Sequence, residues 1–252
     1  MELELWQAAM LTAVGVVAGF LNVMAGGGSL LTVPVMVFMG VPGPVANGTN
    51  RIAILAQNLT AITTFFRRGF SDFKLSLSLA ACALPGAIAG AMVGVQLEGE
   101  WFNRMLALVM VGVMLIMYFD KGNAEQRDDH QPSKRQLWLG HLLMVGVGFW
   151  GGFIQIGIGF IIMPVLNRVM GLDLVRTNMH KVFIIATYTI AALAIFAAQV
   201  EILWIMGAAL ALGNSIGGYL GAHFTVAKGE RLIKIILNIV LVAFIIKLLL
   251  PV

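Results

Sequence analysis

Two short polar motifs lie inside apolar stretches of the chain, and their side chains are suited to holding an anion. Thr49-Asn50-Arg51 and Thr177-Asn178 each combine a hydroxyl with an amide, and the first adds a guanidinium. Neutral donors can bind an oxyanion without a fixed counter-charge, and arginine adds a planar set of donors. The same side chains also join membrane helices by hydrogen bonds, so the motifs alone leave both roles open.

Each motif follows a glycine-containing break in an apolar stretch. The first break carries three consecutive glycines, and the second is Gly157-Ile158-Gly159. A glycine costs ~1 kcal/mol relative to alanine inside a helix. In lipid, a broken helix is tolerated only where its free backbone groups are packed in protein or line a polar cavity. Free N–H groups at the start of the next helix then favour anions.

The breaks and motifs together predict a substrate site, with no catalytic residue and no metal ligand. Its predicted residues are Asn22, Gly26, Gly27, Gly28, Ser29, Thr49, Asn50, Arg51, Gln155, Gly157, Gly159, Thr177 and Asn178.

The composition places this site in a membrane. The chain has 252 residues, of which 60% are hydrophobic and only 11% are charged, and its mean hydropathy is +0.93. No soluble domain has such a composition. The formal net charge of +4 indicates basic cytoplasmic loops and not a nucleic-acid partner. A single cysteine, Cys82, excludes an internal disulfide.

Ten apolar segments follow one another, and eight of them reach the ~20 residues that a membrane span needs. The segments at 29–40 and 160–170 are too short, and we expect them to be half-helices that follow the two breaks. The eight long segments are 6–24, 44–66, 74–95, 101–119, 137–158, 174–198, 202–224 and 230–250. The predicted fold class is an all-α integral membrane protein.

The order of break, proline and Thr-Asn motif occurs twice, about 130 residues apart, with Pro34 and Pro164 at matching places. We therefore predict two membrane repeats, residues 1–119 and 137–252, joined by a polar linker at 120–136. A repeat of this kind with interrupted helices is typical of secondary transporters, whose substrate lies near the midplane between the halves.

Loop charge predicts the orientation. Lys and Arg gather at the turns near 67–74 and 168–181, in the linker, and near 228–234, whereas the remaining turns are mostly acidic. Basic loops stay in the cytoplasm, so the linker is expected there and both termini outside. Each half then makes an odd number of net crossings, which makes the two repeats inverted.

Several polar residues have two open interpretations. Arg51 either marks the site or extends to the lipid headgroups. His180 and Lys181 hold the corresponding place in the second half, where a basic cytoplasmic rim is the other interpretation. No carboxylate is evident within a span, so His180, an ion held by carbonyls, or facilitated diffusion remain open for coupling. The glycines around Gly90 and Gly217 are expected to be packing faces.

The pattern resembles the sulfite exporter TauE/SafE family. The matching residues are Ala25-Gly26-Gly27-Gly28, Pro34 and Ala46-Asn47-Gly48-Thr49-Asn50. The resemblance covers essentially the whole chain, and it is weaker in the second half, where Gln155 to Gly159 has fewer glycines and Val175-Arg176-Thr177-Asn178 lacks the Ala and Gly. It implies transport of sulfite, sulfonates, thiosulfate, sulfoacetate or related anions across the inner membrane.

The leading interpretation is a secondary transporter that moves a small sulfur-containing anion by alternating access. An anion channel on the same scaffold is the second interpretation. An intramembrane enzyme, with Ser29 as nucleophile and His180 as base, is a third, and it is disfavoured because the two lie at different depths. No cofactor is expected, and the expected partners are the anion and the lipid bilayer, not nucleic acid. Substrate, direction, coupling ion and a homodimer stay open.

Overall fold

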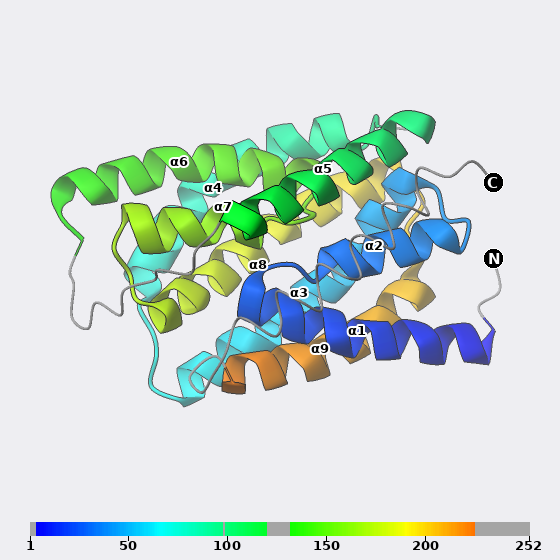
Figure 1. Ribbon diagram of the computed structural model, residues 1–252, viewed down its shortest axis with the longest axis horizontal. Coiled ribbons are helices and arrows are strands. Elements are labelled where there is room, and N and C mark those ends of the chain that lie inside the picture. The colour runs from blue at the N-terminus through cyan, green and yellow to red at the C-terminus, as the bar shows by residue number, and fades with distance from the viewer. Residues whose placement is uncertain (1–3, 98, 120–131, 225–252) are drawn as a thin grey trace.

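The computed structural model describes residues 4–97, 99–119 and 132–224, and these form helices joined by short turns, with no strand among them (Figure 1). The predicted segment at 230–250 and most of the linker lie outside the described residues. The helices are α1 (Leu5–Ala25), α2 (Ser29–Phe38), α3 (Gly43–Arg67), α4 (Phe73–Gly94), α5 (Gly99–Phe119), α6 (Lys134–Phe153), α7 (Gly159–Pro164), its π-helical continuation η1 (Val165–Val169), α8 (Leu174–Gln199) and α9 (Trp204–Phe224).

The all-α membrane fold is confirmed. Helices α1, α4, α5, α8 and α9 are long and apolar enough to cross a membrane. The two predicted half-helices are present as α2 and as α7 with η1. One boundary was wrong. We expected an apolar segment to 158, but α6 ends at Phe153 and residues 154–158 are the break, so Gly159 already begins the next helix. The Thr-Asn motifs lie inside α3 and α8, as predicted.

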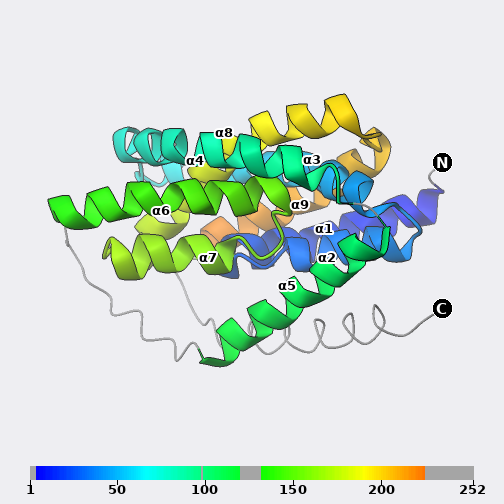
Figure 2. The ribbon, with the colours of Figure 1, turned by 90° about the horizontal axis from the view of Figure 1, so that it is seen from above.

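The two broken pairs enter the molecule from opposite ends (Figures 1 and 2). Helix α1 begins at the right-hand end in Figure 1, and α2 returns to that end. Helix α6 begins at the left-hand end, and α7 with η1 returns to it. Each pair is therefore a hairpin, and the breaks at the two hairpin tips lie in the interior.

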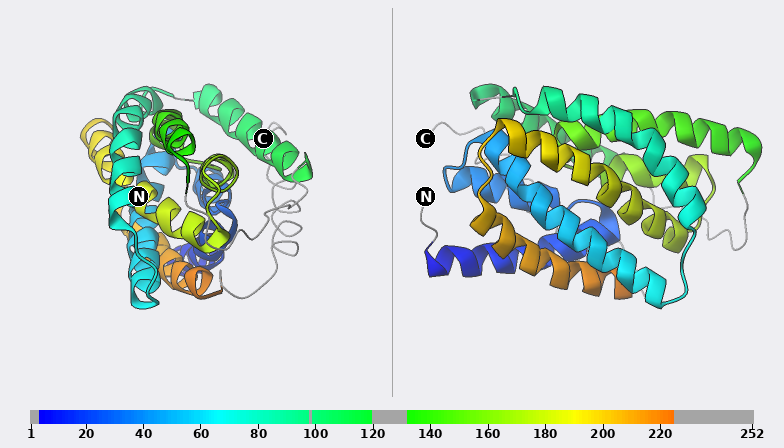
Figure 3. Two further views of the ribbon diagram at one scale, coloured as in Figure 1. Left: turned by 90° about the vertical axis from the view of Figure 1, so that its left-hand side faces the viewer. Right: turned by 180° about the vertical axis from the view of Figure 1, so that it is seen from behind.

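The turns separate by charge. The α3–α4 turn, the η1–α8 turn, the start of α6 and the end of α9 lie at one end, which we call the basic end (Figures 1 and 3). Lys74 and Arg176 are exposed there. The α2–α3, α4–α5 and α8–α9 turns lie at the other end, with Glu100 and Glu201. Asp72 and Asp173 cap α4 and α8 at the basic end, by accepting the N–H of Leu75 at 3.1 Å and of Arg176 at 2.9 Å.

Two helix pairs pack with their backbones in close contact. A Cβ on Gly213 or Gly217 of α9 would meet backbone atoms of α1, and a Cβ on Gly148 or Gly152 of α6 would meet backbone atoms of α4. Small residues allow this approach in membranes. Helix α1 of the first half corresponds to α6 of the second, and α9 corresponds to α4. The two close pairs are therefore equivalent in the two halves. This is what a duplication predicts, and the repeat itself stays a prediction.

The close approach of α4 and α6 can be tested at Gly90. A Cβ there would meet the carbonyl of Phe149 on α6. Gly90→Ala is expected to destabilise the protein by about 1–3 kcal/mol, because the overpacked helices must separate. Gly146→Ala on α6 is the matched control, since its Cβ would meet no atom of the described part of the chain within 4 Å. Thermal unfolding of both variants in detergent should separate them, and equal melting temperatures would contradict the packing.

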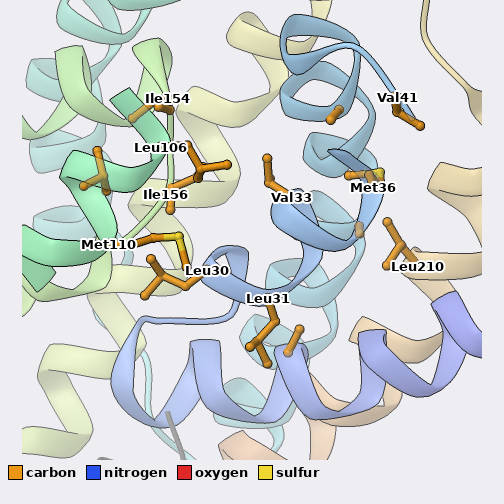
Figure 4. Close-up of a cluster of buried hydrophobic side chains, with 14 of the residues drawn as sticks. Leu30, Leu31, Val33, Met36, Val41, Leu106, Met110, Ile154, Ile156 and Leu210 are labelled. Atoms are coloured by element: carbon orange, nitrogen blue, oxygen red, sulfur yellow. The ribbon is translucent and has the colours of Figure 1, made fainter. Parts of the chain in front are cut away.

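Helix α5 covers the breaks with apolar side chains. Leu106 and Met110 of α5 belong to one buried cluster with Leu30 of α2 and with Ile154 and Ile156 of the second break (Figure 4). The cluster fills the space beside the hairpin tips, so it limits how water reaches them. The polar groups described next therefore lie in an apolar surround.

Candidate functional site

The two glycine breaks contact each other, although more than 130 residues separate them. Gly26 ends α1 with φ +79°, a left-handed conformation that glycine adopts readily. A Cβ on Gly26 would meet the backbone of Gly159, and a Cβ on Gly159 would meet the backbone of Gly26. The hairpin tips from the two ends of the molecule therefore meet backbone to backbone.

Free backbone donors surround this contact. Within the part of the chain that the structure describes, no acceptor receives the N–H of Gly27, Gly28 or Ser29, or that of Gly157 or Gly159. All five residues are buried. Buried N–H groups are normally bonded, and an unbonded set at the start of a helix is where an anion or a water binds.

Asn50 joins α3 to the first turn of α2. Thr32 Oγ1 donates to Asn50 Oδ1 at 2.6 Å, and Asn50 Nδ2 donates to Ser29 Oγ at 3.3 Å. All three side chains are buried. The structure thus brings the predicted residues Ser29 and Asn50 together. Sequence reasoning missed Thr32, although its position three residues after Ser29 places both on one helix face.

Arg51 is fully buried and holds the end of α6. Its Nη1 donates to the carbonyl of Gly151 at 3.0 Å and to Gln155 Oε1 at 2.8 Å, and its Nη2 donates to the carbonyl of Gly152 at 2.5 Å. Its guanidinium lies 4.4 Å from the ring centre of Phe196. The interpretation that Arg51 extends to the headgroups was wrong. Because α6 ends inside the protein, its last carbonyls need donors, and Arg51 supplies them.

Lys181 does the same for α1. Its Nζ donates to the carbonyls of Asn22 at 3.1 Å and Val23 at 2.8 Å, and to Asn178 Oδ1 at 2.6 Å. Only 1% of the side chain is exposed, so the interpretation of Lys181 as a basic rim was wrong. Each half therefore supplies a cation that holds the broken helix of the other half. Cations are favourable at helix C-termini because of the helix dipole.

The remaining predicted side chains have other partners. Asn22 Nδ2 donates to Gln57 Oε1 at 3.2 Å, and Gln155 Nε2 donates to Thr189 Oγ1 at 3.2 Å. Thr49 Oγ1 accepts the N–H of Leu203 at 3.1 Å, and the hydroxyl of Thr177 donates to the carbonyl of Leu172 at 3.3 Å. The two threonines therefore hold the backbone before α9 and before α8. Substrate binding by them stays a prediction.

The interior has more donors than acceptors. Among the described residues, the buried polar side chains include arginine, lysine, amides and hydroxyls but no aspartate or glutamate. Five buried side-chain atoms have no hydrogen-bond partner there. They are Arg51 Nε, Gln57 Nε2, Asn178 Nδ2, the Tyr188 hydroxyl and Asn214 Oδ1. Three of the five only donate. An uncompensated buried donor is costly, so this surplus favours an anionic ligand.

The residues of the alternative enzyme are not paired with each other. Ser29 contacts Asn50, as described above, whereas His180 Nδ1 lies 2.8 Å from the hydroxyl of Ser76. Within residues 4–97, 99–119 and 132–224, no three potential metal ligands gather in one place. The arrangement of the breaks is one of hydrogen-bond donors and cations, which is the chemistry of anion binding.

Comparison with known proteins agrees with this chemistry. The family model described as sulfite exporter TauE/SafE matches residues 11–248. The chain belongs to this family. Among its relatives is the "Probable membrane transporter protein ORF9" of Sinorhizobium sp., which is 29% identical over 245 residues, or 96% of this chain and 92% of the relative. A "Probable membrane transporter protein" of Haemophilus influenzae is 27% identical over 93% of this chain and 91% of its own length.

A third relative, the "Probable membrane transporter protein YfcA" of Escherichia coli, is 27% identical over 90% of this chain and 84% of its own length. The matches span nearly the whole of both proteins, so they concern the complete fold and not a shared fragment. The TauE/SafE protein described here is accordingly a multi-pass membrane protein of a transporter family.

Proposed function

We propose that this TauE/SafE protein is a secondary transporter of a small sulfur-containing anion, such as sulfite, a sulfonate, sulfoacetate or thiosulfate. The observation that carries the proposal is the contact between the two breaks, with free N–H groups on both sides of it. The surplus of buried donors and the lack of buried carboxylates among the described residues support an anion. The family description supports the sulfur chemistry.

The proposed site lies between the tips of the two hairpins. The N–H groups of Gly27, Gly28 and Ser29 and the amides of Asn50 and Asn178 bind the anion. Arg51 and Lys181 act through their positive potential, because the two Nη atoms of Arg51 and the Nζ of Lys181 already hold helix ends. Gln155 and Asn22 support them from the ends of the broken helices.

The direction of the hairpins supports alternating access. One hairpin enters from each end, so moving one against the other would open the shared site to one end at a time. The proposed ligand groups are buried in this structure, which therefore resembles a state closed to both ends. We further propose an inner-membrane location with the basic end in the cytoplasm and both termini outside.

Transport by reconstituted protein tests the proposal. Proteoliposomes are expected to take up sulfite, thiosulfate or sulfoacetate in a saturable manner and without single-channel currents, which would instead indicate a channel. Asn50→Ala is expected to lower uptake by roughly 10- to 100-fold, since it removes a hydrogen bond to a charged ligand worth ~1.5–3 kcal/mol. The measurement is the initial rate across a concentration series.

Asn58→Ala is the matched control for this variant. Asn58 is a buried asparagine of the same helix, but it donates to the carbonyl of Ile54 in its own helix at 2.8 Å. Its uptake should stay within about twofold of wild type, a difference of only ~0.4 kcal/mol. If none of the three anions is taken up, or if both variants transport equally, the proposed function is wrong.

A further inference from the structure

A second feature of the structure is a cavity of about 860 Å³ at the basic end, separate from the contact between the breaks. It lies between the α3–α4 turn, α4, the first turns of α6 and the start of α8. The polar side chains that line it are Ser71, Asp72, Lys74, Ser78, His141, Arg176 and His180. Two of these seven are full cations, Lys74 and Arg176, two are histidines, and one carries a carboxylate.

His180 forms the inner wall of the cavity. Its side chain is buried, and its Nδ1 is bonded to Ser76 at 2.8 Å, so the hydrogen bond fixes the ring. Its Nε2 has no hydrogen-bond partner among the described residues. A second histidine, His141, is held by the carbonyl of Leu137 at 2.7 Å and the hydroxyl of Ser78 at 3.0 Å. Both rings are thus positioned by the protein before any ligand arrives.

The carboxylates near the cavity are already engaged. Asp72 caps α4, and Asp173, which lies beside the cavity, caps α8 and contacts Arg176 Nε at 3.4 Å. Charges at helix N-termini are offset in part by the helix dipole. Lys74 and Arg176 are exposed at the rim. Lys74 and Arg176 are thus the two full positive charges at the rim, and such rim charges attract anions and increase their rate of entry.

One turn of α8 connects the cavity to the centre of the protein. Arg176 and His180 are four residues apart and share the face that lines the cavity. Asn178 and Lys181 are three residues apart on another face and contact each other and the end of α1. The same stretch of α8 therefore faces the cavity on one side and the end of α1 on another.

We propose that this cavity is a second anion site, which loads a small hydrated oxyanion or sulfonate from the basic end before it reaches the breaks. The volume is larger than a bare anion of this class, which leaves room for its hydration water. The loading role rests on the proposed transport function. Binding in the cavity does not, so the two can be tested apart.

Histidine ring signals measure the binding directly. The full-length protein, labelled with ¹⁵N-histidine and placed in nanodiscs, is titrated with methanesulfonate. The ring signals of His141 and His180 are expected to shift together and to saturate, and still to do so in Asn50→Ala. The shifts should be lost in the double variant Lys74→Gln/Arg176→Gln. No shift, or a shift of His223 with the same midpoint, would overturn the proposal, because His223 lines a different pocket at the same end.

Transport kinetics test the loading role. In oriented vesicles, Lys74→Gln/Arg176→Gln is expected to raise the KM roughly tenfold for uptake from the basic end, with kcat unchanged. Arg67→Gln/Arg68→Gln is the matched control, since it removes the same charge from the same end but from the other pocket. An equal rise of KM in both double variants would show a general surface potential and overturn the loading role. If wild type does not transport but the histidine signals shift, the proposed function fails and the anion site stands.

Discussion

Arg51→Ala is expected to destabilise the protein by about 3 kcal/mol or more and to abolish transport. The variant removes the donors of two buried carbonyls and of the Gln155 side chain. Each buried acceptor left without a partner costs ~1–3 kcal/mol. For a chain of this size, that loss corresponds to a fall in melting temperature of about 6–12 °C. Thermal unfolding and the initial rate of uptake, measured on the same preparation, check the prediction.

One further variant separates the charge of Arg51 from its geometry, and a second serves as a control. Arg51→Lys keeps the charge but not the planar fork that reaches both carbonyls, so it is expected to recover part of the stability. Arg104→Ala is the control, because Arg104 is exposed and pairs with Glu100 at 2.7 Å, away from the buried end of α6. Such exposed pairs contribute ~0–1 kcal/mol. A melting temperature for Arg51→Ala equal to that of Arg104→Ala would mean that the α6 end does not depend on this side chain.

Gly159→Ala is expected to lower transport roughly 100-fold, because a displacement of about 1 Å at a binding geometry can cost that much. Its added methyl group would lie against the backbone of Gly26 and push the hairpin tips apart. Gly159 is not among the residues with positive φ, so alanine brings no backbone strain there and the steric contact is the damaging effect of the change. Uptake by proteoliposomes is again the measurement, with the amount of folded protein determined for each variant.

Gly112→Ala on α5 is the control for this second prediction. Among the described residues its Cβ would meet nothing within 4 Å, so the variant should transport normally and gain ~0.5–1 kcal/mol of stability from the better helix former. Normal transport by Gly159→Ala would show that the two breaks can separate without consequence. The proposed site between them would then be wrong.

The fold class and the order of helices could be read from the sequence because apolarity and length are local properties. The half-helices at 29–40 and 160–170 were predicted because glycine weakens a helix wherever it stands. The break in the second half was less clear, because Ile154 to Ile158 carries only one glycine. Its non-helical backbone includes Gln155 at φ +61°, a conformation that local preference disfavours and that the surrounding packing maintains.

The pairing of the polar residues could not be predicted in the same way. The sequence marked Arg51, Lys181, Asn50 and Gln155 as polar groups within apolar segments, which is costly and therefore informative. Their partners lie up to 159 residues away, on helix ends that come together only when the two halves pack. Which carbonyls need a donor depends on where each broken helix stops in space.

The residue types alone thus established a membrane protein with two interrupted helices and a donor-rich interior. Two features arise only in the packed molecule. They are the contact between Gly26 and Gly159 and the hydrogen bonds by which Arg51 and Lys181 each hold a helix end of the opposite half. The physical reason is that a helix end inside a membrane protein must find its hydrogen-bond partners from whatever packs against it. That neighbour is set by tertiary contacts and not by the local sequence.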